Sequence, residues 1–401
     1  MYRTLLTLVW LLGCVGSGMA QEEVLYGQDT LRYTYTPLAP IPADTMAHRP
    51  NFLQRVVNYF GESTVDRSYE KKIDITFAGG PSYSKTTSLG LGVLAAGLYR
   101  LDRTDSITPP SDVTLYGSVS ISGYFTIGIT GNTIFRNSRH KLDYDLAFSS
   151  SPRDIWGIGY EAGRHNIETE ILEQRYSFRA RYLHRFLYGS YAGVVLDFDH
   201  TNGDKMDEVA LAYIGHQKRH YTATGLGLVL EYDTRDFIPN PSKGLYFSLQ
   251  ELFYAKGLGS CDKSLWRTLI RANAYHRVWK DALLAYDLYG EFNSQGTPWS
   301  MLARMGDGER MRGYYTGRYT DNNLLTMQVE LRQHIWRRIG GVAWVGAGNV
   351  FSEISHMRLD ETLPNYGLGL RWELKKRVNV RFDYGFGRDT SGFLLSINEA
   401  F

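Results

Sequence analysis

Apolar and polar side chains alternate with a period of two along most of the chain from residue 71 onward. Segments 174–186, 264–278, 323–335 and 366–374 each place bulky apolar residues on one face and polar residues on the other. This alternation predicts β-strands, and the segments reach the roughly 9–11 residues that a tilted strand needs to cross a membrane. The polar faces of the first two segments carry several arginines, and six of them are candidates to line the lumen: Arg175, Arg179, Arg181, Arg185, Arg267 and Arg271.

The connections between these segments alternate between short and long. Short turns are predicted at 136–140, 187–190, 237–244, 279–281, 337–341 and 375–379, and the longest loops at 150–173, 199–220, 293–320 and 351–362. Outer-membrane barrels have short periplasmic turns and longer external loops. The alternation therefore predicts which end of the barrel faces the periplasm. The strands between these connections predict an all-β fold, a transmembrane antiparallel β-barrel of about 16 strands over residues 71–401.

The first 20 residues predict a secretory signal peptide. A basic residue, Arg3, precedes the apolar run 5–12, and small residues lead up to a cleavage site before residue 21. The apolar run is too short to span a membrane as an anchor. A lipoprotein signal ending at Cys14 is the alternative, although the bulky Leu12 fits that kind of site poorly.

Residues 21–70 lack the alternation and form a separate predicted segment. A short amphipathic helix is expected after Pro50, because Phe52, Val56 and Phe60 fall on one helical face. The helix either packs on the periplasmic rim or lies in the barrel mouth as a plug, since barrels of about 16 strands enclose a lumen.

Composition and charge agree with an exported membrane barrel. The chain has 29 Tyr, 18 Phe, 8 Trp and 41 Gly at a mean hydropathy of −0.30, as expected for a lipid-facing band with aromatic girdles and a polar interior. Cleavage of the signal peptide leaves Cys261 as the one cysteine, so no intramolecular disulfide is expected. The net charge of +2 argues against a nucleic-acid partner.

Within the long loop 293–320, Arg312, Gly313 and Tyr314 form an Arg-Gly-aromatic motif. This motif resembles that of the bacterial surface antigen superfamily, the outer-membrane assembly factors of BamA and TamA type. In that superfamily the sixth external loop folds into the barrel. The strand count places the loop 293–320 between the eleventh and twelfth strands, where the superfamily has it.

Three further features resemble the same superfamily. A strand–turn–strand signature comprises Asp233, Arg235, Asp236, Pro241 and Gly244. The segment 346–351, Gly-Ala-Gly-Asn-Val-Phe, is followed by a glycine-rich strand at 366–371. The aromatic residue Phe401 ends an alternating strand, and the resemblance implies that it is an assembly signal read by the outer-membrane assembly machinery.

The resemblance implies that Arg312 anchors the loop on the inner wall of the barrel, where a buried arginine needs an anion. The inward-facing carboxylates offered by the alternation are Glu330, Glu373 and Asp383, with Glu330 preferred. The alternative is an Arg312 exposed at the loop tip. The chain departs from the superfamily at Gly346, where an aspartate is usual. Residues 21–70 are also too few for a polypeptide-transport-associated domain, which usually precedes such barrels.

The sequence contains no strong motif for catalysis or for cofactor binding. The chain has no Gly-x-Ser-x-Gly elbow, and Cys261 is expected to be an incidental thiol, so we expect no enzyme activity and no cofactor. Acidic residues at 197–207 could bind calcium in an external loop, but their spacing does not follow the helix–loop–helix pattern. Solvated loop charge is therefore the preferred interpretation, and no metal is expected.

The resemblance implies a role in outer-membrane biogenesis, in which protein or lipid is inserted or moved through a weak barrel seam. The inward arginines support a second hypothesis, an anion-favouring pore. A third is a structural scaffold for a periplasmic protein. The expected partners are outer-membrane lipid, the assembly machinery of which the chain is a client, and a periplasmic protein in the scaffold hypothesis.

Overall fold

The fold is given by a computed structural model that describes residues 68, 70–105, 108–238, 240–375 and 378–401. All described residues belong to one compact unit, Phe52–Phe401. The predicted signal peptide and the predicted amphipathic helix lie outside the described residues.

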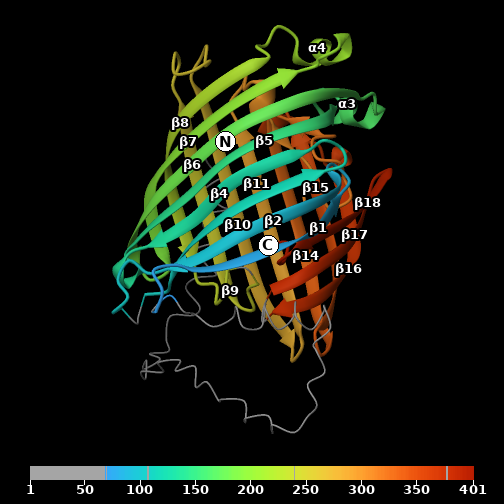
Figure 1. The fold of residues 1–401 in the computed structure, drawn as a ribbon. Coiled ribbons are helices and arrows are strands. Elements are labelled where there is room, and N and C mark those ends of the chain that lie inside the picture. Colours follow the sequence, from blue (N-terminus) through green and yellow to red (C-terminus); the bar gives the residue numbers. More distant parts are fainter. Residues whose placement is uncertain (1–67, 69, 106–107, 239, 376–377) are drawn as a thin grey trace. The chain divides into compact units, whose positions relative to one another are not determined.

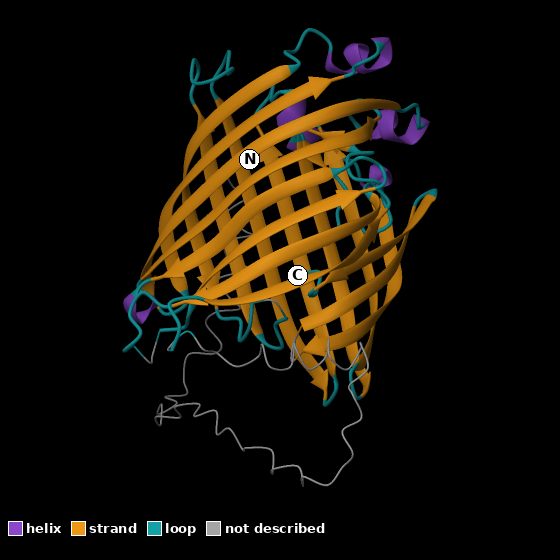
Figure 2. Ribbon diagram, in the orientation of Figure 1, coloured by secondary structure: helices purple, strands orange, loops and turns teal. Residues whose placement is uncertain are grey.

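Within the described part of the chain, sixteen strands close into one antiparallel barrel (Figure 1, Figure 2). Neighbours in sequence pair with each other, β11 pairs with β14 across the longest loop, and β1 meets β18 to close the circle. The barrel strands are β1 (Asp74–Ser84), β2 (Ser88–Tyr99), β3 (Ser111–Ser120), β4 (Phe125–Ile134), β5 (His140–Ile155), β6 (Thr169–Leu187), β7 (Ser190–Asp204), β8 (His220–Asp233), β9 (Gly244–Tyr254), β10 (Leu265–Trp279), β11 (Ala282–Asn293), β14 (Asn323–Trp336), β15 (Ile339–Phe351), β16 (Leu363–Lys375), β17 (Val378–Gly387) and β18 (Thr390–Ile397).

The remaining elements are short and lie in the connections. They are the helices α3 (Tyr160–His165) and α4 (Glu208–Ile214), the 3-10 turns η1 (Arg136–Ser138), η2 (Trp299–Met301), η3 (Ile354–His356) and η4 (Leu359–Glu361), and the two-residue strands β12 (Ala303–Arg304) and β13 (Thr320–Asp321). In the described part of the chain, no helix has the length and apolar character needed to cross a membrane.

The two faces of each strand meet different surroundings. On β8, Leu226, Leu228 and Leu230 are 64%, 68% and 50% exposed, whereas the alternate residues Val229 and Glu231 are buried. Such an outward band of exposed apolar side chains over a buried polar interior is the pattern of a barrel that faces lipid. The structure therefore confirms the predicted fold class and the strand count.

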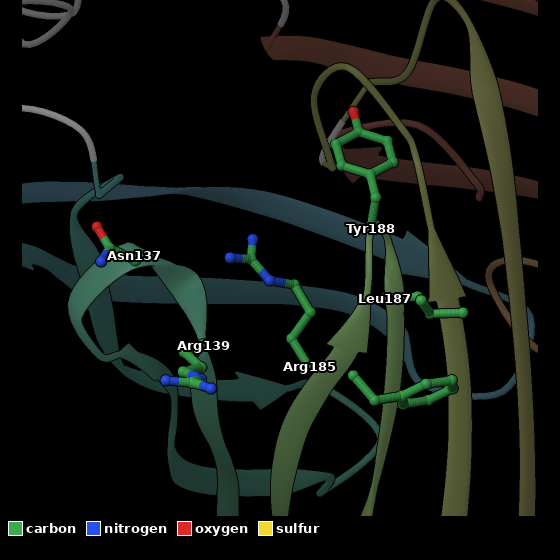
Figure 3. A pocket seen from close by; sticks show the side chains of 6 residues that line it. Asn137, Arg139, Arg185, Leu187 and Tyr188 are labelled. Carbon is green, nitrogen blue, oxygen red and sulfur yellow. The ribbon is translucent and has the colours of Figure 1, made fainter.

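The predicted alternation of short and long connections is also present. The loop 294–322 joins the eleventh and twelfth barrel strands, β11 and β14. At the end of the barrel with short turns, η1 and the β6–β7 turn stand next to each other around an open pocket (Figure 3). Short turns mark the periplasmic end of outer-membrane barrels.

Two placements differ from the sequence-based prediction. The acidic residues Asp197 and Asp199 lie on β7 and are buried, because β7 extends to Asp204 rather than ending at an external loop. Strand β18 ends at Ile397, so Phe401 is not part of it. Residue Asn398 has a φ of +70°, and the chain turns away from the strand there.

We expect the purified chain to be heat-modifiable, because a closed barrel retains its compact form in detergent until it is heated. The unboiled sample should run faster than the boiled sample on a denaturing gel. Equal mobility in both conditions, with a helical circular dichroism spectrum, would contradict the barrel.

Candidate functional site

The loop 294–322 packs against the interior of the barrel. Its buried residues include Met305, Met311 and Tyr319, which form one apolar cluster with Leu324 of β14 and Val350 of β15. Burial of these side chains removes the loop from water, and apolar burial is the main favourable term that can hold it there. The structure therefore differs from the alternative in which Arg312 is exposed to solvent at the loop tip.

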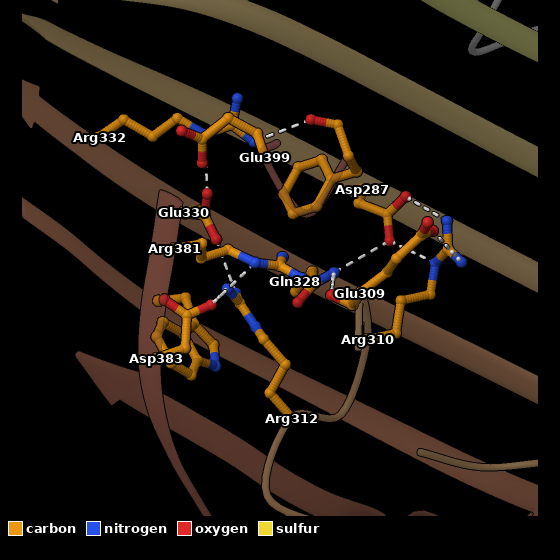
Figure 4. Close-up of polar contacts among 12 residues, drawn as sticks. Asp287, Glu309, Arg310, Arg312, Gln328, Glu330, Arg332, Arg381, Asp383 and Glu399 are labelled. Carbon is orange, nitrogen blue, oxygen red and sulfur yellow. Dashed lines mark hydrogen bonds and ion pairs between the residues drawn. The ribbon is translucent and has the colours of Figure 1, made fainter. Parts of the chain in front are cut away.

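Arg312 lies between two carboxylates on the barrel wall (Figure 4). Its Nη2 is 2.6 Å from Glu330 Oε2 on β14, and its Nη1 is 2.8 Å from Asp383 Oδ2 on β17. All three side chains are at most 1% exposed. The guanidinium also lies 3.6 Å from the ring centroid of Trp344, which suits a cation–π contact.

The backbone of the motif fits closely against β17. Gly313 has a φ of +99°, and a Cβ added there would overlap the backbone of Gly385. Glycine is therefore required at this position for both conformation and space. The Asn365 side chain donates 2.5 Å to the carbonyl oxygen of Arg312, and Thr390 donates 3.0 Å to that of Gly313.

Tyr314 completes the motif with two hydrogen bonds. Burial raises the pKa of Tyr314 to about 12, so its hydroxyl stays protonated at neutral pH. The hydroxyl donates 2.8 Å to the carbonyl oxygen of Pro364 and accepts a 2.8 Å bond from the backbone N–H of Arg388. The aromatic residue thus ties the loop to β16 and to the β17–β18 turn.

The ionic cluster extends beyond the motif. Arg332 is 2.7 Å from Glu330, and Arg371 bridges Asp383 at 2.5 Å and Glu399 at 2.8 Å. Arg381 is 3.7 Å from Asp383. Four arginines therefore face three carboxylates, and in the described residues Arg312 Nε and Arg332 Nη1 have no acceptor. The cluster has more cationic donors than anionic acceptors, so each carboxylate in it is shared.

A second ion pair attaches Arg310, two residues before Arg312, to the barrel wall. Arg310 Nε is 2.7 Å from Asp287 Oδ2 on β11, and its guanidinium lies 4.6 Å from the ring centroid of Tyr289. The loop is therefore attached both to β11 and, through Arg312, to β14 and β17. These contacts can hold a loop in place, and they present no nucleophile or general base to a substrate.

Of the three carboxylates suggested by sequence, the structure places Glu330 and Asp383 against Arg312. Glu373 is not one of the two ion-pair partners of Arg312. It lies at the turn end of β16, where its backbone N–H donates 2.8 Å to the carbonyl oxygen of Arg338. At Gly346 a Cβ would come within 2.9 Å of the Gln328 Cβ. The close packing of β14 explains why no larger residue stands there.

The strand–turn–strand signature has a structural explanation. Arg235 Nη2 is 2.8 Å from Asp233 Oδ2, and the guanidinium stacks on Tyr246 with 4.0 Å to the ring centroid. Asp236 accepts the Ser242 backbone N–H at 2.8 Å.

The two remaining residues of the signature shape the end of this turn. Pro241 is buried at the end of the turn. Gly244 has a φ of +109° beside the backbone of Thr234, which excludes a side chain.

Five of the six inward arginines are paired with acidic groups. The partners of Arg175, Arg179, Arg181, Arg267 and Arg271 are Asp199 (2.5 Å), Asp197 (2.6 Å), Asp143 (2.5 Å), Glu291 (3.5 Å) and Glu309 (3.8 Å), respectively. This pairing occupies Asp197 and Asp199, and no group of acidic, histidine or cysteine side chains in the described residues could hold a metal ion. The lumen wall is therefore close to charge-balanced along these strands.

The last residues of the chain pack inside the barrel. Phe401 is 6% exposed and clusters with Tyr275 of β10 and Ala285 of β11. Arg332 donates 2.9 Å to the backbone oxygen of Phe401. The expectation that Phe401 ends an alternating strand is wrong, and the physical reason is that the ionic cluster draws Glu399 and the residues after it inward.

The closure between β1 and β18 is the weakest pairing of the barrel. A single pair of Cα partners, Tyr83 and Leu395, joins these strands, whereas eleven join β1 to β2 and eight join β17 to β18. Near the loop end, Lys85 Nζ also donates 3.3 Å to the Ser391 carbonyl oxygen. Within the described residues, positions 74–82 of β1 have no partner in β18.

Comparison with known proteins identifies the family. Residues 112–401 match the model of the Omp85 superfamily domain, so the chain belongs to the Omp85 superfamily. This assignment confirms the resemblance to BamA-type barrels and indicates an outer-membrane location. It also agrees with the expectation that the chain is not an enzyme. No curated protein sequence matches the chain.

Solved structures agree on the fold. BamA from Haemophilus ducreyi, lacking POTRA domains 1-3, has a TM-score of 0.54 at 12% identity, over 82% of this chain and 70% of that one. CdiB from Escherichia coli has a TM-score of 0.56 at 12% identity, over 82% and 63%. CdiB from Acinetobacter baumannii has 0.53 at 11%, over 82% and 60%. The chain thus spans less than two thirds of each CdiB chain.

Proposed function

We propose that the chain assists the assembly of outer-membrane protein or lipid by inserting or translocating it through the seam between β1 and β18. The observation that carries this proposal is the single Cα pair, Tyr83 and Leu395, that closes the seam. An unpaired strand edge presents N–H and C=O groups that can pair with an incoming extended segment. Residues 74–82 of β1 supply such an edge.

The anchored loop supports this proposal because it contacts both sides of the seam. Gly313 accepts a hydrogen bond from Thr390 at the start of β18. Thr316 Oγ1 lies 3.1 Å from Thr86 Oγ1 in the β1–β2 turn, and the Thr316 backbone N–H donates 3.0 Å to Thr86. The Arg312 anchor would thereby keep the loop in contact with both edges of the seam.

A disulfide across the seam tests the proposal. Directly opposed residues of antiparallel strands have Cα atoms about 4.5–5.5 Å apart, within the range of a disulfide. In a Cys261→Ser background, Tyr83→Cys with Leu395→Cys should lock the seam and abolish the function of the chain in cells, and a reductant should restore it. Because Cys261 is buried and free, its removal prevents wrong pairing.

The matched control joins Leu395 to its other neighbour. Phe382 and Leu395 are Cα partners in β17 and β18, which remain paired in any opening at β1. Phe382→Cys with Leu395→Cys should therefore leave function intact. Full activity of the seam-locked barrel in its oxidised form would refute transport through the seam, whereas the barrel fold would stand.

The pore hypothesis has less support. An anion-favouring lumen requires uncompensated positive charge, and five of the six arginines that suggested it are paired with carboxylates. The loop 294–322 also occupies interior space beside β14 and β15. No specific observation favours the scaffold hypothesis or identifies a periplasmic partner.

Three further assignments belong to this proposal. Residues 1–20 would be removed as a signal peptide, and residues 21–70 would remain on the periplasmic side or in the barrel mouth. Phe401 would act as an assembly signal before the barrel closes, when the chain is itself a client of the assembly machinery. Its burial in the finished barrel means that the signal would be hidden after folding.

A further inference from the structure

Two arginines converge on one pocket at the short-turn end of the barrel (Figure 3). The pocket has a volume of about 470 Å³ and is lined by Asn137, Arg139, Arg185, Phe186, Leu187 and Tyr188. The Arg185 side chain extends from the end of β6 toward the turn that carries Asn137 and Arg139. A 2.8 Å backbone hydrogen bond from Arg185 N–H to the Arg139 carbonyl oxygen fixes the two positions relative to each other.

These two guanidinium groups lie at the rim of the barrel, beside the register shift between Arg185 and Leu187, and they differ from the five paired arginines of the inner wall. In the described part of the chain, neither Arg139 nor Arg185 forms a side-chain hydrogen bond or an ion pair, whereas the five other inward arginines of the sequence-based set all have carboxylate partners. Two like charges in one pocket repel each other unless an anion lies between them. The pocket is therefore complementary to a negatively charged group.

The surroundings of the pocket are apolar and exposed. Phe186, Leu187 and Tyr188 are 55%, 66% and 78% exposed beside the two arginines. A free inorganic anion gains nothing from such neighbours, whereas a molecule with both an anionic and an apolar part would contact both. Apolar side chains next to basic ones at a barrel rim are the arrangement expected where lipid headgroups meet acyl chains.

The outer surface next to the pocket marks the depth of the membrane interface. The side chains of His140 and Tyr182 are hydrogen-bonded at 2.8 Å, and His184 Nδ1 lies 3.2 Å from His140 Nδ1. Tyr182 and His184 point outward from β6. Polar and aromatic groups on the lipid-facing side of a barrel belong to the interfacial girdle rather than to the hydrocarbon centre.

We propose that this pocket binds the headgroup of an anionic glycerophospholipid from the leaflet that meets the short-turn end of the barrel. Arg139 and Arg185 would clamp the phosphodiester, because the planar guanidinium forms paired hydrogen bonds with phosphate oxygens. The acyl chains would lie against Phe186 and Leu187. This site requires only that the barrel is in a membrane, and it does not depend on transport through the seam.

The test uses the purified mature chain in detergent with phosphatidylglycerol and phosphatidylcholine supplied together. Lipid retained by the protein is measured by native mass spectrometry. We expect the wild-type chain to retain phosphatidylglycerol in preference to phosphatidylcholine. Each basic residue near an anionic lipid surface contributes several-fold to binding, so Arg139→Gln with Arg185→Gln should reduce this preference roughly tenfold.

The matched control removes the same charge at the same end of the barrel. Arg103 and Arg277 are exposed and do not line the pocket, so Arg103→Gln with Arg277→Gln should keep the preference. Equal loss in both double variants would show general charge attraction and overturn the site, as would an unchanged preference in the pocket variant. Heat-modifiability of each variant checks that it has folded.

A competition experiment separates a lipid from a soluble phosphate. The compound sn-glycerol 3-phosphate carries a phosphate on the same glycerol unit without acyl chains. We expect it to displace phosphatidylglycerol poorly, and we expect Leu187→Ser to lower retention of the lipid. Displacement at equal concentration, with no effect of Leu187→Ser, would mean a free-phosphate site and would overturn the lipid assignment.

Discussion

Replacing Arg312 with alanine is expected to release the loop 294–322 from the inner wall while the barrel still closes. The change leaves Glu330 without one of its two arginines and Asp383 without one of its partners, both at 0% exposure. Removing one member of a buried ion pair costs about 3–5 kcal/mol, because the remaining charge stays buried. The measurement is cleavage of the loop by protease added to the outside of cells.

Two comparisons test whether the named carboxylate is the partner. Glu330→Gln should expose the loop in the same way, and the double variant should lose less than the sum of the single losses, as expected for residues in contact. Glu373→Gln is the matched control, because Glu373 takes no part in the ion pairs of Arg312. A loop that stays protected in Arg312→Ala would contradict the anchor.

The second large effect is expected at the inward-turned end of the chain. Glu399 is 2% exposed and lies 2.8 Å from Arg371 and 3.8 Å from Arg332. Its replacement by glutamine leaves two buried arginines with less compensation and should cost about 3–5 kcal/mol. Phe401→Ala removes a buried ring and should cost a similar amount, about 3–5 kcal/mol.

The readout for both variants is the temperature at which the compact gel form converts to the unfolded form. Both should convert at a lower temperature than the wild-type chain. The two changes should also be less than additive, because Arg332 contacts both Glu399 and Phe401. Wild-type thermal behaviour of Glu399→Gln would mean that the end of the chain does not stabilise the barrel.

The fold could be predicted because a membrane barrel imposes a local rule on every strand. Lipid requires an apolar outward residue at every second position. Strand β8, with Leu226, Leu228 and Leu230, can therefore be predicted without any long-range information. The same rule identified the inward position of Glu330 on β14. It could not rank Glu330 against Glu373, because alternation gives the face of a residue and not its height along the barrel.

The parts of the site that sequence did not reveal depend on long-range contacts. Arg332 and Arg371 were on the correct polar faces, but their convergence with Glu399 depends on an inward turn at Asn398 that no periodic pattern marks. The ion pairs that neutralise the lumen arginines could not be predicted, for a similar reason. Asp197 and Asp199 lie opposite Arg179 and Ser177 in the register of β6 and β7, which sequence alone places only approximately.

The measurement that tests the central claim most directly is the composition of the outer membrane after depletion of the chain. If the barrel serves outer-membrane assembly, depletion should lower the abundance of a defined set of outer-membrane proteins or disturb lipid asymmetry. The wild-type chain should restore the normal composition, and the oxidised seam-locked variant should not. An unchanged outer-membrane proteome and unchanged lipid asymmetry after full depletion would contradict the account.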